Sequence, residues 1–107
     1  TVSITLDQTG VDEHLRPGVS FIRPNPFSDT ATLRYTVPSQ GAAVTIGFYD
    51  IRGRLVRKLV ERSFEGGTYD VAWDGRDGSG RAVSSGIYFA RVSIGEWRET
   101  RKIAYVR

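Results

Sequence analysis

Apolar and polar residues alternate along most of this chain, beginning near Val19. In the clearest run, residues 31–37, Leu33, Tyr35 and Val37 are separated by polar neighbours. A period of two places alternate side chains on opposite faces of a β-strand, so one face can be buried while the other is solvated. The pattern therefore predicts strands that each contribute one face to a shared core.

Seven runs of this kind lie between residues 19 and 107, and turn-forming residues separate them every 8–14 residues. The separators include Pro38-Ser39-Gln40-Gly41, the glycine-rich segment 74–80, and Gly95-Glu96, which suits a two-residue hairpin loop. Short strands at this spacing, without a clear helix, predict an all-β fold, an Ig-like antiparallel β-sandwich of two sheets. The residues expected in its core are Leu33, Tyr35, Val44, Ile46, Phe48, Val71, Trp73, Tyr88 and Val92.

One segment departs from simple alternation. Residues 54–61 carry Leu55, Val56, Leu59 and Val60 at a spacing that suits one face of a helix. The segment is short and turns flank it on both sides. Length and neighbours decide such cases, so we predict a strand.

The first run of the predicted sandwich, in which Val19, Phe21 and Arg23 alternate, leads into Pro24-Asn25-Pro26-Phe27. A proline has no backbone N–H to donate to a neighbouring strand. We therefore expect the two prolines to end strand pairing and to protect a sheet edge from non-native strand addition.

Residues 1–17 form a lead-in of different character. Val2, Ile4 and Leu6 alternate with polar residues, which predicts a short strand, and the residues after them have no period. The lead-in fits an added edge strand, the tail of a preceding domain or a linker. Arg16-Pro17-Gly18 is a plausible boundary. We therefore expect a linker or tail over 1–17 and the sandwich over 18–107.

Composition narrows the possibilities further. A length of 107 residues suits one domain, and the absence of cysteine excludes a disulfide scaffold and thiolate metal sites. No stretch is long and apolar enough for a membrane helix, and the N-terminus lacks a signal-peptide pattern, so a secreted protein would need one upstream. The net charge is +3, but acids interrupt both groups of basic residues, which argues against nucleic-acid binding.

Candidate chemistry is sparse. The single histidine, His14, lies in the aperiodic lead-in without a group to orient it, so we expect neither a catalytic site nor a zinc site. Asp74 and Asp77 lie in a glycine-rich turn and are weak calcium candidates, because the EF-hand spacing fails and turn capping explains them better. Trp97 follows a hairpin turn, and an exposed ring there would suit sugar stacking.

Several motifs occur in an order that resembles the C-terminal sorting domains of the bacterial type IX secretion system and the related Ig-like domain of flagellar hook-capping proteins. Residues 24–27 and 32–38 match the opening, residues 48–56 the central hairpin, and residues 69–77 with 80 and 85–89 a third signature. Residues 100–103 match the closing strand, and the resemblance covers about 19–107. The signature residues are Pro24, Asn25, Pro26, Phe27, Gly53, Trp73, Asp74, Gly75, Gly86 and Tyr88.

Two of these glycines have an expected physical role. Gly53 supplies a turn that a residue with a Cβ would strain. Gly86, just before Tyr88, is expected to let its loop pass close to a neighbouring strand.

The resemblance implies a non-catalytic sorting domain without a cofactor. Such a domain carries a covalently attached upstream cargo through the outer membrane of a Bacteroidetes-type bacterium to the cell surface or the medium. The translocon recognises it, and a sortase-like peptidase cuts ahead of the sandwich, here within 1–17. The segment read by the machinery would be Arg101, Lys102 and Ile103 of the last strand. We expect a monomer with no membrane span and no nucleic-acid partner.

The other branch of the resemblance implies an interaction or spacer module of a secreted enzyme or of a flagellar hook-assembly scaffold. The stretch from Trp73 to Asp77 is common to both branches and does not separate them. The chain stops at Arg107, just after the closing strand, and this favours the sorting interpretation.

Overall fold

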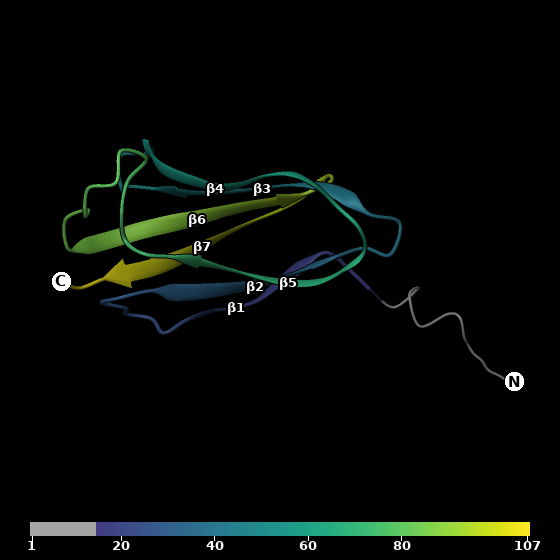
Figure 1. The fold of residues 1–107 in the computed structure, drawn as a ribbon, viewed down its shortest axis with the longest axis horizontal. Helices are drawn as coiled ribbons and strands as arrows, with labels where there is room; N and C mark the ends of the chain where they lie inside the picture. The colour runs from purple at the N-terminus through teal and green to yellow at the C-terminus, as the bar shows by residue number, and fades with distance from the viewer. Residues whose placement is uncertain (1–14) are drawn as a thin grey trace, which may run out of the picture.

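The predicted turns divide residues 15–107, the part that the computed structural model describes, into seven β-strands (Figure 1). The expectations for His14 and for the strand near Val2 concern residues outside this range. The strands are β1 (Gly18–Arg23), β2 (Ala31–Val37), β3 (Ala42–Tyr49), β4 (Leu55–Phe64), β5 (Gly67–Trp73), β6 (Gly86–Ile94) and β7 (Trp97–Tyr105).

The strands form two antiparallel sheets, which Figure 1 shows as two layers. One sheet has the order β1-β2-β5 and the other the order β4-β3-β6-β7. The hairpins β3–β4 and β6–β7 stay within the second sheet, whereas the connections after β2, β4 and β5 cross between the layers. The all-β, Ig-like sandwich expected from the sequence is confirmed.

The core lies between the two layers. Eight of the nine expected core residues are buried; the exception is Val71, which is half-buried and packs against the others. Trp73 of β5 stacks on Phe48 of β3, with ring centroids 4.3 Å apart, and this contact joins the two sheets. The core also takes in Phe27 and Tyr105, which the sequence analysis did not select.

The helix-like spacing of residues 54–61 has a structural cause. The segment is a strand, as predicted, but its pairing with β3 skips two residues: Ile46 pairs with Val60 and Gly47 with Lys58, which leaves Leu59 between them. The pairing shifts again past Val56. Each extra residue changes the phase of the alternation, so apolar residues fall in adjacent pairs.

A shift in strand pairing also occurs in β1, and it changes which residues of that strand are buried. Val19 pairs with Tyr35 and Phe21 with Arg34, so the register shifts between them. Val19 is buried, but Phe21 does not continue its face: the guanidinium of Arg23 lies over the Phe21 ring, 3.8 Å from its centroid. The expected alternation of Val19, Phe21 and Arg23 on one face is therefore wrong, because a bulge intervenes.

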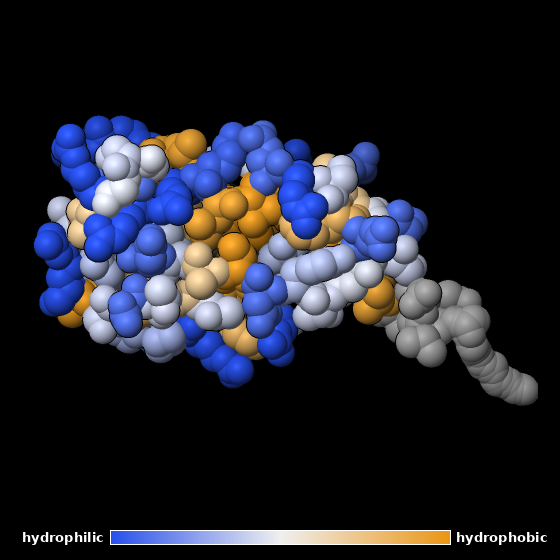
Figure 2. Space-filling view, in the orientation of Figure 1, coloured by the Kyte–Doolittle hydropathy of each residue, from blue (hydrophilic) through white to orange (hydrophobic). Residues whose placement is uncertain are grey.

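The surface is mostly hydrophilic. Figure 2 shows an apolar area near the middle of the face in view and smaller apolar areas toward its margins, with charged and polar side chains between them. Within residues 15–107 there is no helix long and apolar enough to cross a membrane. The large apolar residues that protrude are Ile51, Leu55, Ile87 and Val106.

Candidate recognition strand and its surroundings

The three residues expected to be read by a secretion machine lie in β7, at the edge of the four-stranded sheet. Neighbouring side chains in a strand point to opposite faces, so Lys102 lies on the other face of β7 from Arg101 and Ile103. Ile103 is 0% exposed and belongs to the core, whereas Lys102 is exposed. A partner that docks on the folded domain can therefore contact Lys102 and part of Arg101, but not Ile103.

Arg101 joins the two layers of the sandwich. Its Nη2 donates to the backbone carbonyl of Val19 in β1, at 2.9 Å, and its Nε pairs with Glu99. Its side chain is 38% exposed. Arg101 thus holds β7 against the opposite sheet while part of its guanidinium stays accessible.

The outer edge of β7 is covered by the side chain of Asn25. Asn25 Nδ2 donates to the carbonyl of Lys102 at 3.2 Å, and the backbone N–H of Ala104 donates to Asn25 Oδ1 at 2.9 Å. One amide side chain therefore satisfies a donor and an acceptor that a neighbouring strand would otherwise pair.

Phe27 continues this cover with its backbone. Its N–H donates to the carbonyl of Ala104, and its carbonyl accepts from the N–H of Val106, both at 2.9 Å. Its side chain is 2% exposed, and its ring lies 4.9 Å from that of Tyr105. The two prolines flank the protective segment, but the groups that protect the edge belong to Asn25 and Phe27. In the sequence, this cover of the β7 edge is marked only by a polar residue, Asn25, between two prolines.

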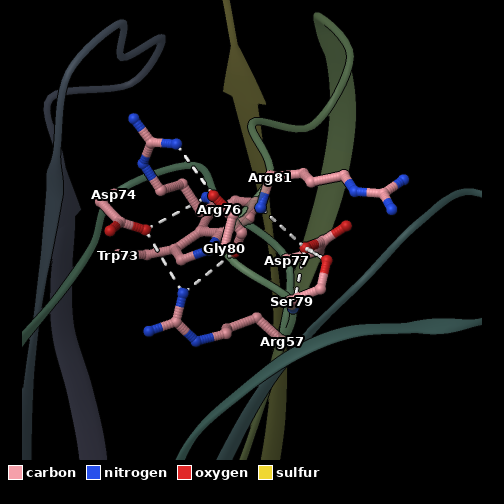
Figure 3. Close-up of polar contacts among 8 residues, drawn as sticks. All are labelled: Arg57, Trp73, Asp74, Arg76, Asp77, Ser79, Gly80 and Arg81. Carbon is pink, nitrogen blue, oxygen red and sulfur yellow. Dashed lines mark hydrogen bonds and ion pairs between the residues drawn. The ribbon is translucent and has the colours of Figure 1, made fainter.

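The loop after β5 is held by its own carboxylates and by an arginine from β4 (Figure 3). Asp74 Oδ1 accepts from the backbone N–H of Arg76 at 3.1 Å and from Arg57 Nη1 at 3.4 Å. The carbonyl of Arg76 accepts from Trp73 Nε1 at 2.9 Å and from the same Arg57 Nη1 at 3.2 Å. The loop is thereby fixed to the core and to the neighbouring edge strand.

Asp77 organises the second half of this loop (Figure 3). Its Oδ1 accepts from Ser79 Oγ at 2.7 Å, from the N–H of Ser79 at 2.9 Å and from the N–H of Arg81 at 3.1 Å. These hydrogen bonds, above all that from the Ser79 hydroxyl, hold the pKa of Asp77 below its ordinary value. The carboxylate acts as a turn cap.

The hydrogen bonds and neighbours of Asp74 and Asp77 describe the two calcium candidates but do not test calcium binding. One oxygen of Asp74 and one of Asp77 already accept hydrogen bonds within the loop. Within residues 15–107 no three His, Cys, Asp or Glu side chains gather as a metal site would require. The acid that shares an open hollow of about 420 Å³ with Asp77 is Asp50 from the β3–β4 turn, not Asp74. Calcium binding by Asp74 and Asp77 stays a prediction.

Two signature glycines lie where a side chain would be strained. Gly53 has a φ of +84°, and its N–H donates to the carbonyl of Asp50 in the β3–β4 turn. Gly75 has a φ of +73°, and a Cβ placed on it would lie 2.7 Å from Tyr105 Cε1. Gly75 is therefore required both by its backbone and by the ring that packs on it.

Gly86 opens β6, and its backbone pairs with Tyr105 of the neighbouring strand β7. Nothing lies within 4 Å of a Cβ placed on Gly86, so its φ of +156°, and not a lack of space, is what favours glycine there. The expectation of an exposed ring at Trp97 is wrong. Trp97 is only partly exposed and packs against the core, so it does not offer a free ring for sugar stacking. Tyr88 is buried as expected, and its hydroxyl donates to the carbonyl of Ser84 at 2.6 Å.

Comparison with known proteins adds a family and three structural relatives. A family model described as the FlgD Ig-like domain matches residues 26–95. The chain is similar to dimeric latent PorU from Porphyromonas gingivalis, with 24% identity, a TM-score of 0.69, and coverage of 84% of this chain and 9% of that one. It is also similar to PorZ, described as an essential bacterial surface component of the type-IX secretion system of the same organism, with 27% identity, a TM-score of 0.57, and coverage of 84% and 12%.

The third relative is FlgD from Xanthomonas campestris, whose structure is linked to the hook capping essential for flagellar assembly. It has 21% identity, a TM-score of 0.55, and coverage of 84% of this chain and 64% of that chain. No curated protein matches the chain. The chain thus spans about a tenth of PorU and of PorZ and just under two thirds of FlgD.

Proposed function

The chain belongs to the FlgD Ig-like domain family, and from this premise we propose that it is a sorting domain of a larger protein exported by a type IX secretion system. In this proposal the translocon recognises the folded sandwich and moves an attached upstream cargo across the outer membrane. A sortase-like peptidase then cuts within residues 1–17, and the cargo is secreted or stays at the cell surface.

The observation that carries this proposal is the likeness to the type IX secretion protein PorZ, at 27% identity over 84% of this chain. PorU adds a second relative with the same fold. Ig-like folds host many functions, so a fold alone would not favour secretion. The family relation combined with a named secretion component supports it.

We propose further that the domain acts by binding rather than by catalysis and as a monomer, without nucleic acid or a cofactor. The described polar groups support binding over catalysis, since no polar or charged residue in residues 15–107 is buried. A catalytic group usually needs a desolvated environment that shifts its pKa toward its task. The acids with shifted pKa values, Asp50, Asp70 and Asp77, owe the shift to hydrogen bonds within turns or between strands.

The accessible part of the closing strand is where recognition would occur. Lys102 is exposed, and Asn25 holds its carbonyl, so its position on β7 is fixed. Ile103 contributes by holding the strand in the core. Removing the whole strand would confuse recognition with folding, so surface substitutions give the sharper test.

The experiment fuses residues 1–107 behind a reporter with an inner-membrane signal peptide, in a host that has a type IX secretion system. We expect the reporter at the cell surface or in the medium, measured by fractionation and by protease accessibility of intact cells. Lys102→Glu should lower this export several-fold, because it reverses the accessible charge of the recognition strand.

Lys58→Glu is the matched control, because Lys58 is also exposed and lies on β4, at the opposite edge of the same sheet. Circular dichroism of the purified domains should show both variants folded. If the reporter with the unchanged domain stays in the periplasm, the sorting role is wrong, and the interaction or spacer role of the family takes its place.

A further inference from the structure

The outer face of the four-stranded sheet carries a hollow, lined in part by hydroxyl and guanidinium side chains, that the proposed function does not use. Thr45 of β3 pairs with Ser93 of β6, and Ser93 pairs with Arg98 of β7. In the next row, Gly47 pairs with Arg91, and Arg91 with Thr100. These residues alternate with the buried Ile46 and Val92, so they face away from the core.

Gly47 is the one residue lining the hollow that contributes no side chain. The hollow has a volume of about 310 Å³, and both rows of residues line it. The backbone does not require glycine at this position, because Gly47 is not among the glycines with a positive φ. A glycine within a strand is destabilising relative to alanine, because it loses more backbone freedom on folding. Leu55 and Tyr49 lie over the place that a Gly47 side chain would take, where a Cβ would lie 3.2 Å from Leu55 Cδ1 and 3.3 Å from Tyr49 Cε1.

Two arginines of this hollow have no carboxylate partner within 4 Å in the described part of the chain. The guanidinium of Arg91 lies over the Tyr49 ring, 4.1 Å from its centroid, and Arg98 makes no ion pair there. Glu99 also lines the hollow, but its carboxylate pairs with Arg101. The hollow therefore combines the hydroxyls of Thr45, Ser93 and Thr100 with two guanidinium groups that no carboxylate of residues 15–107 pairs with.

Guanidinium groups bind carboxylates and phosphates with two parallel hydrogen bonds, and nearby hydroxyls complete the set of donors. The residues around the hollow favour a carboxylate of a polypeptide over a phosphate of a nucleic acid. Beside the hollow the same face carries the half-exposed Leu55, which pairs with Tyr49, and the partly exposed Phe89 and Ile87. An apolar border suits a polypeptide that presents acidic and apolar side chains together, and a nucleic-acid backbone has no such groups to fill it.

We propose that this hollow, here called the Gly47 hollow, binds a carboxylate side chain of an acidic polypeptide segment, with apolar side chains of that segment packed on Leu55 and Phe89. Lys102 lies at the border of this binding surface, because it pairs with Phe89 in the outward-facing row next to Arg91 and Thr100. The domain would thereby hold a partner by the face of its sheet as well as at the edge of β7.

The test titrates the isotope-labelled domain with a blocked peptide in which glutamate alternates with leucine and phenylalanine, followed by NMR. We expect amide shifts that centre on Thr45, Gly47, Arg91, Ser93, Arg98 and Thr100. The same peptide with glutamine in place of every glutamate should bind at least about tenfold more weakly, since it lacks the charge that the guanidinium groups pair with.

The double variant Arg91→Glu/Arg98→Glu should weaken peptide binding at least about tenfold, since two donors to the carboxylate are lost. The matched control Arg81→Glu/Arg107→Glu carries the same change in net charge on exposed residues outside the hollow and should bind as the unchanged domain does. Gly47→Ala, whose methyl group would press on Leu55 and Tyr49 without changing charge, should displace these bordering side chains and weaken binding as well.

Equal binding of the glutamate and glutamine peptides would overturn the proposal, as would shifts confined to another surface. Tighter binding of an oligothymidylate or of vesicles containing phosphatidylglycerol than of the peptide would also overturn it, in favour of a phosphate ligand. Because the readout is direct binding, the result does not depend on whether Lys102→Glu affects export.

Discussion

Asn25 illustrates how much a single side chain can do at a sheet edge. A β-strand at an edge exposes unpaired N–H and C=O groups that attract other strands. The Asn25 amide satisfies two of these groups on β7, and Phe27 satisfies two more with its backbone. The prolines on either side contribute no N–H of their own, so the segment protects the edge without extending the sheet.

We predict that Asn25→Ala lowers the free energy of unfolding by about 1–2 kcal/mol, because it removes two hydrogen bonds that are each worth about 0.5–1.5 kcal/mol. Urea unfolding followed by circular dichroism measures the loss. Asn25→Asp keeps the acceptor for Ala104 and loses the donor to Lys102, so its loss should be smaller. Unchanged stability of both variants would show that the edge does not need this cover.

The carboxylate of Asp77 predicts a pH dependence. Hydrogen bonds from Ser79 and Arg81 lower its pKa in the folded domain below the value of about 3.9 that an unfolded chain has. The ionised form therefore stabilises the fold above that unfolded value, and the contribution is lost as the pH falls through the folded pKa. Asp77→Asn should be less stable than the unchanged domain at pH 7, and the difference should shrink in the acid range.

The measurement is urea unfolding at a series of pH values, together with NMR titration of the Asp77 carboxyl. Ser79→Ala removes the strongest of the hydrogen bonds, so it should raise the pKa of Asp77 toward its ordinary value. A constant stability difference between Asp77→Asn and the unchanged domain at all pH values would mean that charge is not the cause.

At the scale of elements, β7 is both the proposed recognition strand and part of the core. Ile103 and Tyr105 are buried, and the rings of Phe27 and Trp73 pack around Tyr105. Loss of a large buried side chain costs about 3–5 kcal/mol, and a small domain has only about 5–15 kcal/mol in total.

We therefore predict that a chain truncated after Lys102 fails to fold, which loss of near-ultraviolet circular dichroism and of dispersed NMR signals would show. A reporter fused to this truncated chain should stay in the periplasm for that reason alone. If the truncated domain keeps its native spectra, then the aromatic packing around Tyr105 is not needed for the fold.

The strands also show what a sequence can and cannot predict. Strict alternation in β2, β3 and β6 identified each buried face, because regular pairing keeps the period of two. Bulges shifted the alternation of buried and exposed residues in β1 and β4. From the sequence alone, the extra residue of a bulge cannot be told apart from the spacing of a helix. Phe27 and Tyr105 escaped selection because long-range contacts between the chain ends of the sandwich bury them.

For the candidate site, too, the sequence indicated some features and missed others. The sequence located β7 and the Asp74–Asp77 loop, since turn residues and a family resemblance mark both. It could not show that Ile103 is inaccessible, that Asp50 rather than Asp74 shares a hollow with Asp77, or that Gly47 lines a second hollow. Those facts depend on cross-strand register, which only the paired sheets define.

At the scale of the whole molecule, the two sheets share one core. Trp73 belongs to the three-stranded sheet, yet its ring stacks on Phe48 and meets Tyr88 edge-on, and both of these belong to the other sheet. Arg57 and Arg101 each bind across the layers by hydrogen bonds at the two sides of the sandwich. Neither sheet buries its apolar face without the other.

Unfolding should therefore be a single transition. Trp97→Phe leaves Trp73 as the one remaining tryptophan, so fluorescence then reports the contact between the sheets while circular dichroism reports the strands. We predict that the two signals change at the same urea concentration, as a two-state domain requires. A fluorescence change that precedes the loss of strand signal would mean that the layers separate before they unfold, and that the core does not unite them.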